Sequence, residues 1–275
     1  MQKPKYIRWL VEEKTVLNNG TPVKSYFIDY NDDSKVLDDW ALHIRRHYIS
    51  DKELATACEE LELSTEEYLR KFKIPQKNDK MGPTARSNTI SEILFSDLLE
   101  FIYGYTIPRV RQRNMSGKTV SEHGTDVIGY KFFDSSRKPS IKDKLVAVEV
   151  KVVLSKKDMD VFMTSTNDSA NKDSYRVSLT LDYLKNKLRM LKEDEIANNI
   201  VRFQKKTVMN YEINYVAAGM TCLQKLMPKT DKEDIIIIPE VDGNMLKITS
   251  ESKIFFVHGE RLMQLAHFVY ERCVK

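Results

Sequence analysis

Apolar and polar residues near the start of the chain first follow the pattern of strands and then that of helices. Residues 24–30 have the composition of a strand, and an Asn-Asn-Gly turn signal precedes them, which predicts a β-hairpin. From residue 33 to about residue 72 the apolar side chains recur at helical spacing. Ser64 and Glu67 form the S-x-x-E pattern of a capping box at the start of the last of these helices. Residues 1–80 are therefore expected to form an accessory N-terminal region.

Residues 74–154 alternate between loop, helix and strand patterns. Residues 74–83 are rich in proline, glycine and charge, which predicts a loop that ends the accessory region. Residues 84–101 carry one apolar stripe, typical of an amphipathic helix. Residues 106–113 predict an extended segment, and residues 126–133 and 145–154 predict two strands of a hairpin.

The remainder of the chain predicts a mixture of helices and strands. Helical spacing covers two segments, 179–191 and 193–203, and two further segments have the pattern of strands, 211–218 and 235–238. A last helix is expected at 259–273. The sequence therefore indicates an α/β protein in which residues 81–275 form the second region.

Composition narrows the class of protein. Apolar residues make up 41% of the 275 positions and charged residues 31%, which excludes wholesale disorder. No run of eighteen apolar residues predicts a membrane span, and the first residues lack a secretory signal. Three cysteines far apart in the sequence suit a reducing cytoplasm, so we expect a cytoplasmic protein. The small basic excess, a net charge of +4, is compatible with a phosphate-rich ligand.

The most informative segment reads Val-Glu-Val-Lys-Val inside the apolar, largely β-branched run 145–154. Side chains alternate along a strand, so Glu149 and Lys151 point to the same face, about 7 Å apart. Burying these charges without compensation would cost several kcal/mol, and a metal site is one way to supply that compensation. The alternative is an ordinary salt bridge between the two side chains on a half-exposed strand.

Asp126 opens the preceding strand, directly after Gly124-Thr125. If the two strands pair, Asp126 can lie beside Glu149 at the open end of the sheet. Two carboxylates, the backbone carbonyl of Val150 and waters then form a site suited to Mg²⁺, for which Mn²⁺ can substitute. Lys151 can orient or help deprotonate a metal-bound water. In the alternative interpretation Asp126 only caps a turn.

Asp126 and the segment Glu149-Val150-Lys151 together resemble the D-(x)n-E-x-K signature of the PD-(D/E)xK nuclease superfamily. This resemblance implies a restriction-endonuclease-like core, a central mixed β-sheet flanked by helices. It also implies a glutamate on the first helix of the core, and Glu92 matches that position. Thr125 stands where the superfamily usually has proline.

A narrower resemblance rests on His123-Gly124-Thr125-Asp126 and on Ala147-Val148-Glu149-Val150-Lys151. Both segments are similar to the HamA family, the nuclease subunits of the Hachiman anti-phage defence system. The likeness covers most of the chain in length and order, with its specific motifs within residues 84–155. It implies a DNA nuclease restrained by a superfamily 2 helicase partner, HamB-like, until foreign or damaged DNA is sensed.

Further residues are candidates for contact with DNA. Arg109, Arg111 and Arg113 alternate along the expected extended segment, so they could contact successive phosphates, or they could form a solvated edge. Lys156 and Lys157, which follow the strand with Glu149, could approach the scissile backbone. His123 could touch substrate or serve structure.

Two further histidines, His43 and His47, are spaced for zinc on a helix but lack a third ligand. We expect them to be core or surface histidines.

The leading functional hypothesis is a Mg-dependent DNA endonuclease or nickase that acts as the effector of a defence system. One alternative keeps the same site in a stand-alone restriction endonuclease. A second alternative is a catalytically inactive nucleic-acid-binding module, against which the presence of all three signature residues argues.

Overall fold

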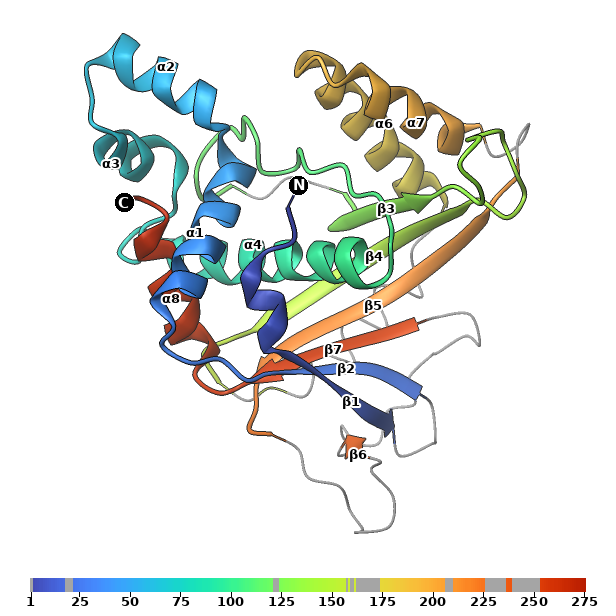
Figure 1. Cartoon of the computed structure of the whole chain (residues 1–275), viewed down its shortest axis with the longest axis horizontal. Coiled ribbons are helices and arrows are strands. Elements are labelled where there is room, and N and C mark those ends of the chain that lie inside the picture. Colours follow the sequence, from blue (N-terminus) through green and yellow to red (C-terminus); the bar gives the residue numbers. More distant parts are fainter. Residues whose placement is uncertain are drawn as a thin grey trace.

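The structure is a computed structural model of the 275-residue chain, shown in Figure 1. It describes residues 2–17, 22–120, 124–156, 158, 161, 174–205, 210–225, 236–238 and 253–275. None of the helices in these ranges is both long and apolar enough to cross a membrane. All three cysteines lie in the described ranges and are free thiols.

A seven-stranded mixed sheet forms the centre of the molecule, with the strands in the order β3-β4-β5-β7-β2-β1-β6 (Figure 1). Its strands are β1 (Leu10–Leu17), β2 (Pro22–Ile28), β3 (Val127–Lys131), β4 (Lys144–Val153), β5 (Glu212–Cys222), β6 (Ile236–Ile238) and β7 (Lys253–Gly259). β4 pairs antiparallel with β3 and parallel with β5, and β7 lies parallel to both β5 and β2. β4 is therefore an inner strand, as its run of apolar residues predicts.

Helices cover both faces of this sheet. They are α1 (Ser34–Tyr48), α2 (Asp51–Leu61), α3 (Thr65–Tyr68), α4 (Gly82–Asp97), α6 (Ser174–Met190), α7 (Asp194–Gln204) and α8 (Leu262–Arg272). Three short helices accompany them: the 3-10 helix η1 (Lys5–Trp9) and the π-helices η2 (Leu69–Lys73) and η3 (Leu98–Ile102). The expected capping box is present at α3, where the Ser64 hydroxyl accepts from the Glu67 N–H and the Glu67 carboxylate accepts from Ser64. The mixed sheet with flanking helices confirms the α/β fold with a restriction-endonuclease-like core.

Alternate residues of β4 pack into two different hydrophobic clusters. Val146 and Val148 join the cluster that contains the apolar side chains of α1, α4 and α8. Leu145 and Ala147 join the cluster formed with α6 and α7. Odd-numbered positions of β4 therefore face α6, and even-numbered positions face α4.

The N-terminal region contributes directly to the sheet. β2 forms a parallel pair with β7, and α1 packs against α8 (Figure 1). One hydrophobic cluster contains residues from both sides of position 80. The boundary predicted at residue 80 thus lies in a loop. The hydrophobic core itself is shared by the residues on both sides of that boundary.

Most of the expected elements are present, with two differences. The first hairpin, the helix after residue 84, the strand pair and the terminal helix are confirmed, while the turn at residues 18–20 lies outside the described residues. The expectation of an extended segment at 106–113 is wrong. Only Thr106 makes a β-bridge, to Tyr130, and residues 109–114 form turns. Strand β7 was not expected.

Candidate active site

The pairing of β3 with β4 places Asp126 beside Glu149. Val127, the residue after Asp126, is paired with Val148, the residue before Glu149. Glu149 and Lys151 lie two positions apart on β4, so their side chains share one face of the sheet. The pairing of the two strands therefore brings Asp126 close to both residues.

Asp126, directly before β3, is held by a backbone N–H of β4. Its Oδ2 accepts a hydrogen bond from the Val150 N–H at 2.8 Å. A strand residue directs its N–H and its C=O to the same edge, so the Val150 carbonyl points toward this side of β4 as well. Gly124, two residues before Asp126, has φ +112°, and an added Cβ would lie 2.7 Å from Thr180 Oγ1. The glycine therefore allows the turn that delivers Asp126.

Glu149 is nearly buried, with cationic side chains at its two oxygens. Lys151 Nζ lies 3.5 Å from Oε1, and Arg176 Nη2, from the first turns of α6, lies 4.0 Å from Oε2. The Glu149 side chain is 5% exposed, whereas Lys151 is 33% and Arg176 is 45% exposed. The Glu149–Lys151 salt bridge, which the alternative interpretation expected, is thus present. The side chains of Lys151 and Arg176 both extend from the buried carboxylate to solvent.

Glu92 approaches the same end of β3 from α4. Its Oε2 accepts from Gln112 at 3.1 Å and lies 3.4 Å from Arg111 Nε. The Arg111 guanidinium also reaches Asp126 Oδ1, at 3.5 Å. Burial raises the pKa of Glu92 to about 7, Arg111 opposes this rise, and the neighbouring charge of Asp126 adds to it. The structure thus connects Glu92 with Asp126 through one arginine.

These residues offer the oxygen ligands that a hard divalent cation prefers. Asp126, Glu149 and the Val150 carbonyl converge from two neighbouring strands, and they fit the two-carboxylate donor set expected for Mg²⁺ or Mn²⁺. Within the described ranges, no group of three or more His, Cys, Asp or Glu side chains could hold a metal ion. A metal here would therefore depend on backbone and water oxygens in addition to the two carboxylates.

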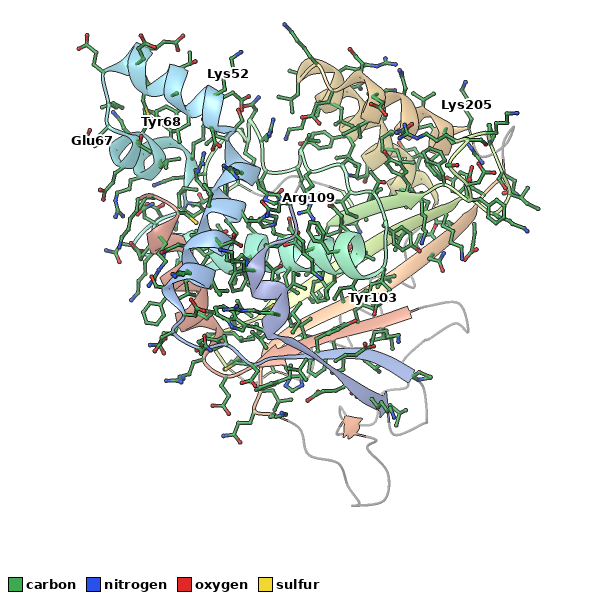
Figure 2. The ribbon with its side chains drawn as sticks, in the orientation of Figure 1. Lys52, Glu67, Tyr68, Tyr103, Arg109 and Lys205 are labelled. Carbon is green, nitrogen blue, oxygen red and sulfur yellow. The ribbon has the colours of Figure 1, made fainter. Side chains whose placement is uncertain are left out.

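Arg109, labelled in Figure 2, is buried inside the protein. Its Nη2 lies 2.5 Å from Asp97 Oδ1, its Nε donates to Glu100 at 2.6 Å, and its Nη1 donates to His47 Nε2 at 2.8 Å. The side chain is 8% exposed. The expected row of arginines on one face is wrong at this position, because buried acids draw Arg109 inward.

The remaining DNA-contact candidates have different surroundings. Arg111 belongs to the Glu92–Asp126 contact, and Arg113 Nη1 lies 3.7 Å from Glu193 Oε1. Lys156 is 72% exposed, with its Nζ 3.9 Å from Asp158. His123 and Lys157 lie outside the described residues.

His43 and His47 are both buried and take part in hydrogen bonding. His43 Nε2 lies 2.9 Å from Asp97 Oδ2, and His47 Nδ1 lies 2.8 Å from the His43 carbonyl. The guanidinium of Arg109 occupies the remaining nitrogen of His47. They are core histidines, as expected, and the zinc spacing does not produce a zinc site here.

The sequence interpretation missed three residues that shape this site. Arg176 faces Glu149, Gln112 donates to Glu92, and Thr180 Oγ1 accepts from the Thr125 N–H at 3.1 Å. Arg176 and Thr180 follow Lys151 by a long stretch of chain and carry no motif. Only the packing of α6 against the β3 end of the sheet brings them in.

One family model matches the chain. The family model described as HamA matches residues 4–273, nearly the whole chain. No curated protein matches the chain.

Proposed function

The chain belongs to the HamA family, which places it in Hachiman anti-phage defence, and from this premise we propose that it is a Mg-dependent deoxyribonuclease. The proposed reaction is hydrolysis of DNA phosphodiester bonds, as endonuclease or nickase. The observation that carries the proposal is that Asp126 Oδ2 accepts a hydrogen bond from the Val150 N–H, directly beside Glu149, while Lys151 Nζ lies 3.5 Å from Glu149 Oε1. An inner apolar strand has no structural need for this arrangement of charges.

In the proposed site Asp126, Glu149 and the Val150 carbonyl would hold Mg²⁺, or Mn²⁺ in its place. When bound, the ion would supply Lewis acidity to the hydrolysis. The bond from the Val150 N–H fixes one oxygen of Asp126, so the carboxylate is oriented before any ligand arrives. Lys151, one-third exposed and 3.5 Å from Glu149, is placed to orient the attacking water by donating a hydrogen bond.

Arg176 extends the same site toward substrate. One of its nitrogens donates to the Gly124 carbonyl at 3.1 Å, which anchors the guanidinium next to Glu149. Nearly half of the side chain remains exposed, so other N–H groups can bind a phosphate oxygen in the fork geometry of arginine. Arg176 therefore replaces Arg109 as the best-placed arginine for contact with DNA, and Lys156 stays a candidate.

Membership of a defence family also supports regulation by a partner protein over a stand-alone restriction endonuclease. In this proposal a superfamily 2 helicase, HamB-like, restrains the nuclease until foreign or damaged DNA is present. A restriction endonuclease would need its own sequence recognition.

Cleavage of supercoiled plasmid tests the proposed activity, with the chain assayed alone and together with its helicase partner. Wild type should cut in Mg²⁺ and not in EDTA. Glu149→Gln and Lys151→Met should each lower the rate about 100-fold or more, because each removes a group that acts on the reacting atoms.

Strands β4 and β5 provide matched control variants. Lys144 and Glu212 form an ion pair of 3.2 Å at the far end of the β4–β5 pair, and both are more than 40% exposed. Lys144→Met and Glu212→Gln repeat the same chemical changes away from the site and should leave the rate unchanged. Cleavage that survives both Glu149→Gln and Lys151→Met would refute the assignment.

A further inference from the structure

Arg111 lies between the carboxylates of Glu92 and Asp126, which come from two different parts of the fold. Its Nε is 3.4 Å from Glu92 Oε2 on α4, and its Nη2 is 3.5 Å from Asp126 Oδ1 at the start of β3. Its Nη1 donates to the Thr125 carbonyl at 2.8 Å. Each guanidinium nitrogen therefore meets a different acceptor, an arrangement that suits the planar fork of arginine and that one ammonium could not reproduce.

The surroundings explain why a cation is needed at this point. The side chains of Glu92, Asp126 and Arg111 are only 12%, 18% and 11% exposed. Two carboxylates in so little water repel each other and lose hydration, and a positive charge between them offsets both costs. Arg111 supplies that charge from within the chain.

Two small cavities meet at this contact. One, of about 120 Å³, extends along α4 toward Met81 and Val120, and the other, of about 30 Å³, reaches Asp126. Glu92, Arg111 and Gln112 line both cavities. The Arg111 side chain therefore borders both a water-sized space beside Asp126 and the larger cavity.

We propose that Arg111 is a resident cation that neutralises the Glu92–Asp126 pair in the metal-free protein and leaves Asp126 when a divalent ion binds there. This inference rests on the proposed metal site at Asp126, and it adds that Arg111 competes with the metal ion for the Asp126 carboxylate. The guanidinium and the ion carry charge of the same sign, so they cannot both lie against Asp126 Oδ1 at low cost. Movement of Arg111 would also change the shape of both cavities that it lines.

Metal binding to the full-length protein without DNA tests this inference. Mn²⁺ is titrated into wild type and into Arg111→Gln, which keeps a polar side chain and removes the charge. The variant should bind Mn²⁺ about tenfold more tightly or better, because the competing cation is gone. In EDTA it should melt at a lower temperature than wild type, and saturating Mn²⁺ should raise its Tm by more than it raises that of wild type.

The matched control is Arg113→Gln, two residues further along the same segment. The Arg113 side chain is 20% exposed, and its Nη1 lies 3.7 Å from Glu193, which belongs to neither the Glu92–Arg111 nor the Asp126–Arg111 pair. The affinity of Arg113→Gln for Mn²⁺ should stay within about twofold of wild type.

A second measurement avoids the risk that Arg111→Gln does not fold. In wild type, the Arg111 Nε–H should exchange slowly with solvent in EDTA and faster once Mg²⁺ is added, as followed by NMR with Arg111→Lys to assign the signal. Equal Mn²⁺ affinities for wild type and both glutamine variants, or an Arg111 signal unchanged by Mg²⁺, would overturn the role of Arg111 and leave the proposed nuclease site standing. Absence of Mn²⁺ binding in every variant would overturn both.

Discussion

The buried carboxyl of Glu92 should make the metal-free protein lose stability as the pH rises. Burial raises its pKa from 4.5 to about 7, with Asp126 adding to the rise against the opposing effect of Arg111. Between these two values the folded protein binds more protons than the unfolded chain, so the free energy of unfolding falls with increasing pH. Glu92→Gln removes the titrating group and keeps the shape of the side chain.

The size of the effect follows from the shift. Each pKa unit corresponds to about 1.4 kcal/mol, so a change from 4.5 to about 7 corresponds to about 3 kcal/mol. At pH 5 the protonated Glu92 of wild type resembles glutamine, and the two proteins should be similarly stable. At pH 8.5 the variant should be the more stable by about 3 kcal/mol.

Urea denaturation followed by circular dichroism in EDTA, at pH values from 5 to 8.5, measures this difference. Ser96→Ala, one turn along α4, serves as the control, since it removes a hydroxyl that donates to the Glu92 carbonyl and no ionisable group. Its effect on stability should be the same at every pH. A difference between Glu92→Gln and wild type that stays constant across the range, or grows toward acid pH, would refute the reasoning.

Three other variants test the surrounding structure. Burial lowers the pKa of His47 to about 3, so wild type should lose stability as the pH falls below 6.5, and His47→Gln should show a flatter profile in urea denaturation between pH 6.5 and 4. Asp97→Asn leaves Arg109 in the interior without its main counter-charge, and denaturation at pH 7 should show a loss of about 3 kcal/mol. Gly124→Ala combines φ +112° with a Cβ 2.7 Å from Thr180 Oγ1, and a thermal melt should reveal a loss of about 1–3 kcal/mol together with lower cleavage activity.

The central part of the fold and site could be predicted because its signals are local. A ten-residue apolar run interrupted only by Glu149 and Lys151 indicates an inner strand, and the order of β3 and β4 along the chain makes their pairing the simplest one. Asp126 could be assigned to the candidate site because it directly precedes β3, which pairs with β4. Similarly, the Ser64 capping box depends on residues three positions apart.

The remainder depends on contacts between distant parts of the chain. The arginines at 109, 111 and 113 alternate like an exposed strand, yet Asp97, Glu92 and Glu193 draw each one in a different direction. Strand β7 has a short apolar core whose pattern also fits a buried helical segment, and only its pairing with β2 and β5 distinguishes the two. Arg176 could not be predicted, because nothing in the sequence specifies how α6 packs against β3.

The most direct test of the proposed nuclease site is one ratio: the single-turnover cleavage rate of Glu149→Gln divided by that of Glu212→Gln, in Mg²⁺ and with the helicase partner present. Both variants change one glutamate to glutamine on paired strands of the same sheet, one at the candidate site and one at the far end. A ratio of about 0.01 or less is the predicted result. A ratio near one, with cleavage still dependent on Mg²⁺, would place the active site elsewhere in the protein.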